Sequence, residues 1–147
     1  MKKLLLICLA AFAAASCTQE KQQSKPLYMW FDCEGNYATL SHPDSIRYYV
    51  SKIHDMGFTD VVVDVKSIMG ETLYKSDIAP YMGEWDGVTR PENYDLLGYF
   101  IEEGHKLGMR VHGSLNVFAG GHNFFDRGII YGDHADWQSQ VYTEGKI

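Results

Sequence analysis

The stretch VVVDVKS, residues 61–67, combines a run of branched apolar residues with two charged side chains. A valine-rich run of this length is typical of a buried strand, where an isolated charge is costly unless it is paired or solvated. Asp64 and Lys66 are two positions apart, so they lie on the same face of an extended chain. We therefore expect a strand with one apolar face and one polar, partly wet face, on which Asp64 and Lys66 can form an ion pair.

Two further segments, 27–34 and 109–117, repeat this alternation and are also expected to be strands. One face of each segment is apolar, and the other face becomes polar toward the carboxyl end. The polar positions include Asp32 and Glu34 on the first strand, Asp64 and Lys66 on the second, and His112 and Asn116 on the third.

Apolar residues at helical spacing predict two helices between these strands, at 43–56 and at 96–107. Ser41 is placed to cap the first helix and Asp95 to cap the second. A glycine follows the end of each helix, Gly57 after the first and Gly108 after the second. The order strand–helix–strand–helix–strand predicts a parallel sheet with right-handed crossovers.

The polar strand face favours an α/β fold of the (β/α)₈ TIM-barrel type. An open doubly wound sheet has helices on both faces, so both faces of its strands are apolar. In a barrel the helices cover only the outer face, and the functional residues lie at the carboxyl ends of the strands and in the following loops. The segment 67–94, expected to be mostly loop, would cover that end.

The length of the chain sets a limit on this fold. A barrel needs about 250 residues, and the chain has 147. We therefore expect a truncated chain that contains only the first three or so β/α units of the barrel. A small exported α/β domain without a ligand is the structural alternative.

The first 17 residues have the features of a secretory signal peptide: two lysines, a short apolar run and small residues before Cys17. The ending Ala14–Cys17 resembles a bacterial lipobox, in which the cysteine becomes lipidated. We expect an exported protein anchored in the cell envelope through a lipid on Cys17, with the outer membrane as the expected site. Residues 18–26 would form a polar tether and residues 27–147 the barrel portion.

Four segments carry a family resemblance: MWFDCEGN (29–36), FTDVVVDVKSIMGETLYKSDIAP (58–80), YDLLGYFIEEGHKLGMRVHGSLNVF (94–118) and HADWQSQVYTEGKI (134–147). Together they resemble the bacterial glycosyl-hydrolase-like family 10, whose members are exported barrel proteins and often lipoproteins. Lys66 stands where that family has an arginine, so a bidentate contact to a carboxylate is lost. Gly113 and Ser114 stand where it has a small residue followed by tryptophan.

The resemblance implies a glycoside hydrolase that cleaves O-glycosidic bonds of a poly- or oligosaccharide. Such hydrolysis needs two carboxylates, and we expect the catalytic pair to lie beyond residue 147, so no catalytic residue is assigned. A non-catalytic, surface glycan-binding lipoprotein is the alternative. The residues expected to bind substrate are Asp32, Glu34, Asp64, Lys66, Tyr74, His112 and Asn116.

Composition argues against several other functions. The net charge of −6 and the lack of a basic block make nucleic acid an unsuitable partner. The His and acidic residues in 118–136 match no zinc signature, and no phosphate-binding glycine loop is present, so neither a metal nor a cofactor is expected. Cys33 is the only cysteine left once Cys8 and Cys17 are set aside, and it is expected to be a small buried apolar residue.

Overall fold

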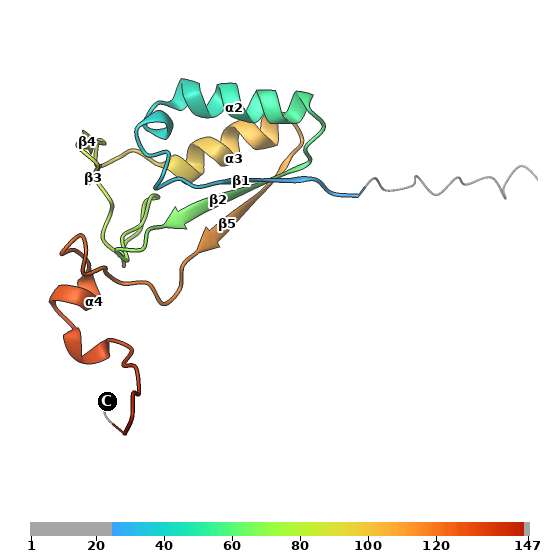
Figure 1. The fold of residues 1–147 in the computed structure, drawn as a ribbon. Coiled ribbons are helices and arrows are strands. Elements are labelled where there is room, and N and C mark those ends of the chain that lie inside the picture. Colours follow the sequence, from blue (N-terminus) through green and yellow to red (C-terminus); the bar gives the residue numbers. More distant parts are fainter. Residues whose placement is uncertain (1–24, 146–147) are drawn as a thin grey trace, which may run out of the picture.

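Three strands form a parallel sheet at the centre of the computed structural model: β1 (Tyr28–Phe31), β2 (Asp60–Lys66) and β5 (Arg110–Leu115). Their order is β1–β2–β5, so β2 is the central strand (Figure 1). The structure describes residues 25–145. The predicted signal peptide, Cys17 and most of the predicted tether lie outside the described residues.

Two helices, α2 (Pro43–Asp55) and α3 (Leu96–Lys106), lie side by side over one face of the sheet (Figure 1). Both begin at the predicted residue and end one residue earlier than predicted. Their apolar stripes and one face of β2 form the core, whose buried side chains include Ile46, Val50, Ile53, Val61, Val63, Val65, Leu96 and Phe100.

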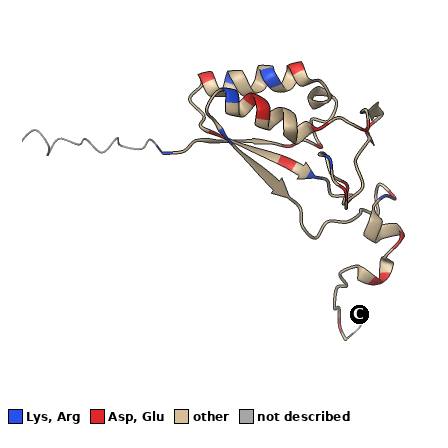
Figure 2. Ribbon diagram, turned by 180° about the vertical axis from the view of Figure 1, so that it is seen from behind, with Lys and Arg blue, Asp and Glu red and all other residues tan. Residues whose placement is uncertain are grey.

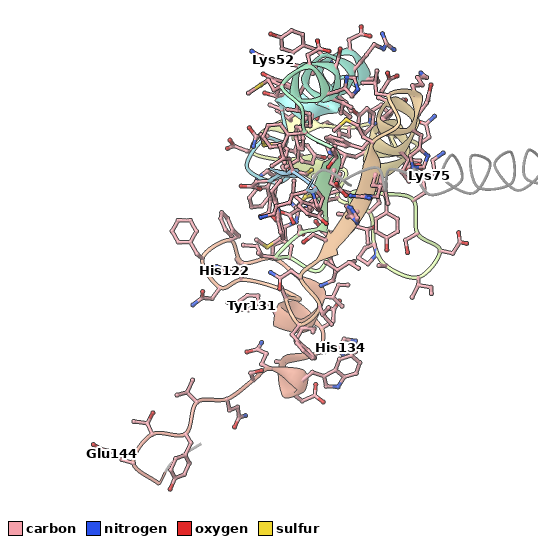
Figure 3. The ribbon with its side chains drawn as sticks, turned by 90° about the vertical axis from the view of Figure 1, so that its right-hand side faces the viewer. Lys52, Lys75, His122, Tyr131, His134 and Glu144 are labelled. Carbon is pink, nitrogen blue, oxygen red and sulfur yellow. The ribbon has the colours of Figure 1, made fainter. Side chains whose placement is uncertain are left out.

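No helix within residues 25–145 covers the opposite face of the sheet (Figure 3). Tyr28 and Trp30, which point to this face from β1, are 54% and 60% exposed. The side view in Figure 3 shows both helices on the same side of the sheet, while the segment after β5 runs away from them. Figure 2 shows charged residues on both helices and toward the carboxyl end of β2. The predicted alternation of an apolar and a polar strand face is confirmed for β1 and β2, whereas on β5 it ends at Leu115, which is 52% exposed.

The predicted (β/α)₈ barrel is wrong. Residues 25–145 form an open three-stranded sheet with β1 and β5 at its edges, a separate two-stranded antiparallel sheet and a few short helices, without any closed barrel. The alternation of apolar and polar residues does not distinguish a barrel from an open sheet, because it requires only that helices cover one face of the strands. An open sheet with one helix layer satisfies that requirement as well as a barrel does.

The segment 67–94, expected to be mostly loop, contains a short hairpin of β3 (Glu84–Trp85) and β4 (Val88–Thr89). The turn between these strands has positive φ at Asp86 (50°) and Gly87 (75°). Two consecutive residues in this region match a two-residue hairpin turn, for which Asp-Gly is a preferred sequence. The turn places Trp85 opposite Val88 in the hairpin.

Arg90 fixes this long segment against the connection between β1 and α2. Its side chain is buried, and its guanidinium carbon lies 3.6 Å from the centre of the Tyr37 ring. Nε donates to the Ser41 hydroxyl (2.7 Å) and Nη2 donates to the Tyr37 carbonyl (2.9 Å). Burial lowers the pKa of Arg90. The guanidinium thus ties the two segments together through both hydrogen bonds and ring stacking.

The predicted helix caps have different outcomes. Asp95 caps α3, since its carboxylate accepts a hydrogen bond from the Gly98 amide (3.0 Å). The prediction for Ser41 is wrong. Its hydroxyl donates to the Tyr37 carbonyl (2.6 Å), and His42 precedes α2 without a side-chain cap. Nε of Arg90 donates to the Ser41 hydroxyl oxygen, and this oxygen does not accept a hydrogen bond from an α2 amide.

Between β5 and residue 145 the chain forms two short helical turns, α4 (Ile129–Gly132) and η2 (Ala135–Trp137); a third, η1 (Thr39–Ser41), precedes α2. The first part of this segment is tied to the sheet, because the Gly121 amide donates to the Ile68 carbonyl (3.0 Å). None of the helices within residues 25–145 is long and apolar enough to cross a membrane.

Candidate functional site

A cleft of about 610 Å³ lies at the carboxyl ends of the three parallel strands, and we call it the strand-end cleft. Its walls come from the strand ends, from the loop after β2 and from the β3–β4 hairpin. Five of the seven residues predicted to bind substrate line it: Asp32, Glu34, Asp64, Lys66 and Asn116. Parallel strands place their carboxyl ends at one edge of a sheet, which explains why residues far apart in sequence meet here.

Two tryptophans also line the strand-end cleft, although neither is among the seven residues predicted to bind substrate. Trp30 shares the polar face of β1, and its indole N–H donates to Oδ2 of Asp64 across the strands (2.9 Å). Trp85 comes from the hairpin. Trp30 could have been found from the alternation, since it is two positions before Asp32. Nothing in the local pattern places Trp85.

Asp64 and Lys66 do not form the expected ion pair in the described part of the chain. Nζ of Lys66 donates to the carbonyl oxygens of Asn116 (2.7 Å) and Ala119. Burial lowers the pKa of Lys66. Lys66 therefore holds the segment after β5 against the end of β2, and Asp64 has Trp30 as its partner.

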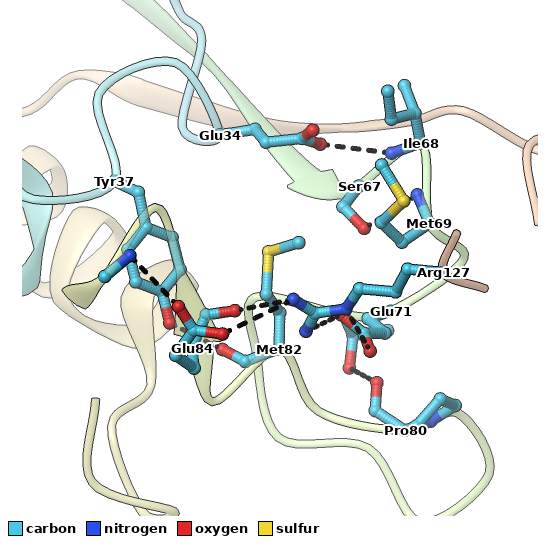
Figure 4. A network of polar contacts seen from close by, with 12 residues as sticks. Glu34, Tyr37, Ser67, Ile68, Met69, Glu71, Pro80, Met82, Glu84 and Arg127 are labelled. Carbon is cyan, nitrogen blue, oxygen red and sulfur yellow. Dashed lines mark hydrogen bonds and ion pairs between the residues drawn. The ribbon is translucent and has the colours of Figure 1, made fainter. Parts of the chain in front are cut away.

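Asp32 and Glu34 have different environments although they are two residues apart. Asp32 is exposed, and its Oδ1 accepts a hydrogen bond from the Gly35 amide (2.8 Å), which closes the turn after β1. Glu34 is half-buried, and its Oε2 accepts from the Ile68 amide (3.1 Å), as Figure 4 shows. Burial raises the pKa of the Glu34 carboxyl, and the nearby charge of Asp32 adds to this.

A polar network behind the cleft connects the segment after β5 to the hairpin (Figure 4). Arg127 makes a bidentate contact with Glu71, in which Nε donates to Oε1 (3.1 Å) and Nη2 to Oε2 (2.6 Å). Its Nη1 donates to the Glu84 carbonyl (3.0 Å). The guanidinium carbon lies 5.9 Å from the centre of the Trp85 ring. This network supports the tryptophan that lines the cleft.

Tyr74 and His112 do not line the strand-end cleft. Tyr74 is partly buried and packs against the core. His112 lies on the uncovered face of the sheet, where its Nε2 is 2.7 Å from Oδ1 of Asp60 and its ring is 5.7 Å from that of Tyr28. His112 therefore belongs to a different cluster, at the amino end of β2.

Asp60 is the centre of that cluster and was not singled out from the sequence. Its side chain is fully buried and accepts two hydrogen bonds from Arg110, Nε to Oδ1 (2.6 Å) and Nη2 to Oδ2 (2.7 Å). The Thr59 hydroxyl donates to Oδ2 (2.5 Å). Hydrogen bonds from Arg110 hold the pKa of Asp60 well below its usual range. The cluster joins β2 to β5 at the end of the sheet opposite the cleft.

The geometry suits a polar organic ligand. Among residues 25–145 no group of three or more His, Cys, Asp or Glu side chains is arranged to hold a metal ion. The strand-end cleft instead combines carboxylates, an amide and two indole rings. Cys33 is fully buried, as predicted, and burial raises the pKa of its thiol to about 12.

Comparison with known proteins gives one relative and no family. No family model matches the chain. The chain is 28% identical over 125 residues to an S-layer-related protein from Niallia circulans, in an alignment that covers 81% of this chain. The chain spans about 8% of the length of that curated relative. The name of that relative agrees with the prediction that the chain is an exported or cell-surface protein.

Proposed function

We propose that this chain is an exported, carbohydrate-active protein of the glycoside hydrolase type, and that the strand-end cleft binds its saccharide. One observation carries the proposal: three carboxylates, one amide and two tryptophans meet in a single cleft. A sugar offers vicinal hydroxyls, which pair with carboxylate and amide groups, and an apolar ring face, which stacks on an indole. The four segments that resemble glycosyl-hydrolase-like family 10 support the same function.

We propose Glu34 as the proton donor of the hydrolytic reaction, which revises the expectation that both catalytic carboxylates lie beyond residue 147. Hydrolysis of a glycosidic bond needs one carboxyl group that is protonated near neutral pH and one that is ionised. Burial raises the pKa of Glu34, which favours its protonated form. In the proposed reaction Glu34 gives its proton to the leaving oxygen as the bond to the anomeric carbon breaks. Water adds its hydroxyl to that carbon, and the remaining proton of the water passes to one of the other two carboxylates of the cleft. Asp32 and Asp64 are the carboxylates in the same cleft.

Release of reducing ends by the full chain tests this proposal. The substrates are soluble α- and β-linked glucans, xylan and chitin oligosaccharides. We expect Glu34→Gln to lower the rate at least about 100-fold, the usual contribution of a general acid. Glu92→Gln is the matched control, because Glu92 is exposed and does not line the cleft. Equal rates for both variants would contradict the assignment of Glu34.

A non-catalytic glycan-binding protein is the second candidate. Trp30 favours it, because its ring is largely exposed beside Asp64 and so is available for stacking. This candidate predicts that a glycan binds to the wild-type chain without release of reducing ends, and that Trp30→Ala weakens this binding. Absence of both binding and hydrolysis across the substrate set would refute both candidates.

We also propose that a lipid anchor on Cys17 holds the protein in the outer membrane. Its support is the signal-peptide pattern that ends at Cys17. Labelling of bacteria that express the full chain with radioactive palmitate should mark the wild-type protein and not Cys17→Ser. Fractionation should place the labelled protein in the outer membrane. An unlabelled wild-type protein would exclude the anchor.

A further inference from the structure

A second hollow of about 480 Å³, which we call the outer hollow, adjoins the strand-end cleft. Three residues line both: Glu34, Gly35 and Trp85. Each volume is in the range of about 300–1,000 Å³ that is common for ligand pockets. Because the two hollows share these residues, they lie next to each other at Glu34 and Trp85.

The outer hollow has the same kind of chemistry as the strand-end cleft. Its aromatic wall is formed by Trp85 and Phe125, whose rings pack edge to face with centres 4.9 Å apart. Asn36 and Thr39 contribute an amide and a hydroxyl at its edge. Beneath them, Tyr37 is buried and its hydroxyl donates to the Met82 carbonyl (2.8 Å), so the wall is firmly held.

The ionisable groups that line both hollows are mostly carboxylates. Their carboxylates are Asp32, Glu34, Asp64 and Asp86. Lys66 is the only cation among their described lining residues, and it is engaged by two backbone carbonyls. Like charges placed close together across an interface are unfavourable. A uronic acid or another anionic sugar is therefore poorly suited to the strand-end cleft and the outer hollow.

We propose that the ligand is a linear chain of neutral sugars that occupies both hollows at once, with sugar units on either side of Glu34 and Trp85. This inference rests on the proposed function and specifies its substrate class. Glu34 lies at the junction of the hollows, beside the bond that links the two parts of the chain. Trp85 offers its ring at the same junction.

Calorimetric titration of the full chain tests the inference. The ligands are the di- and tetrasaccharides of the cellulose, maltose and chitin series, with tetragalacturonate as the anionic ligand. We expect at least one neutral tetrasaccharide to bind about tenfold more tightly than its disaccharide, and tetragalacturonate to bind more weakly than that tetrasaccharide.

Ala38→Trp serves to block the outer hollow, because Ala38 is an exposed residue of its lining. It should reduce tetrasaccharide affinity to that of the disaccharide and leave disaccharide affinity unchanged. Phe125→Ala should weaken tetrasaccharide binding alone, without adding bulk. Ile78→Trp is the control, since Ile78 is 98% exposed and lines neither hollow. Circular dichroism checks that each variant is folded.

The possible results separate the two proposals. Equal affinity for di- and tetrasaccharide, or no effect of Ala38→Trp and Phe125→Ala, overturns the two-hollow inference and leaves saccharide binding in place. Tighter binding of tetragalacturonate overturns the neutral-sugar assignment. If none of the ligands binds, both the proposed function and this inference are wrong.

Discussion

Asp60 has no exposed side-chain surface, yet it is ionised through its contacts with Arg110, Thr59 and His112. A buried carboxylate is tolerated only when its oxygens are well hydrogen-bonded. Here both oxygens accept charge-assisted bonds from one guanidinium. Asp60 therefore stabilises the pairing of β2 with β5, while the carboxylates at the opposite strand ends remain accessible to a ligand.

Asp60→Asn should lower the free energy of unfolding by about 2–3 kcal/mol at pH 7, because hydrogen bonds to a charged partner are lost. The pKa of Asp60 is lower in the folded chain than in the unfolded chain. Its stabilising effect is therefore full above the unfolded-state pKa, about 4, and is lost as the pH falls toward the folded-state value. Urea denaturation at pH 7 and pH 3 should show a smaller difference between wild type and variant at pH 3.

Asp44→Asn is the control for this prediction. Asp44 pairs with Arg47 at 2.8 Å, but its side chain is 87% exposed. An exposed pair contributes about 0–1 kcal/mol. If both variants have the same effect, or if the difference for Asp60→Asn is unchanged at pH 3, the charged cluster is not what stabilises this end of the sheet.

At the scale of elements, α3 and β5 approach each other closely at Gly104. A β-carbon added at Gly104 would lie 2.7 Å from Cγ2 of Val111. Real β-carbons essentially never have contacts this short, so a larger residue would push the helix from the strand. The glycine is inside a helix, where alanine is otherwise preferred by about 1 kcal/mol. Packing therefore outweighs helix propensity at this position.

Gly104→Ala should lower the free energy of unfolding by about 1–3 kcal/mol, as is usual for an overpacked core. Thermal and urea denaturation of the full chain measure the effect. Gly132→Ala is the control, because a β-carbon there meets no atom within 4 Å. A Gly104→Ala protein that is as stable as Gly132→Ala, or more stable than wild type, would mean that helix propensity prevails.

At the scale of the whole molecule, the segment after β5 has few contacts with the core, and Arg127 supplies a central one. Its bidentate contact with Glu71 joins residues 56 positions apart in the chain. Its contact with the Glu84 carbonyl joins the same segment to the hairpin. The position of the hairpin beside the strand-end cleft thus depends on one arginine from the segment after β5.

Arg127→Met should release the segment 118–132 and leave the sheet intact. We expect faster amide hydrogen exchange in that segment and in residues 84–89, with unchanged exchange in β2. Saccharide affinity should fall as well, because Trp85 loses its support. Arg47→Met is the matched control, because Arg47 pairs with Asp44 and Glu103 on the helices. Exchange that changes equally in both variants would show that Arg127 does not anchor the segment.

Much of the local structure could be predicted. The alternation in 61–67 fixes the strand and its two faces, and helical spacing fixes both helices to within one residue. Five predicted site residues meet in the strand-end cleft because parallel order alone places them at one edge. The outer hollow and the Arg127 network could not be predicted, because they depend on contacts between segments far apart in sequence.

The sequence by itself determined which segments are helices and strands, which face of each is apolar, and the order of these elements. These properties follow from side-chain polarity over a few neighbouring residues. Only the tertiary structure decided that the sheet is open, that Asp64 is paired with Trp30 and not with Lys66, and that burial raises the pKa of Glu34. The physical reason is that closure, pairing and burial depend on which distant segments pack together. A polar strand face is compatible with more than one such packing.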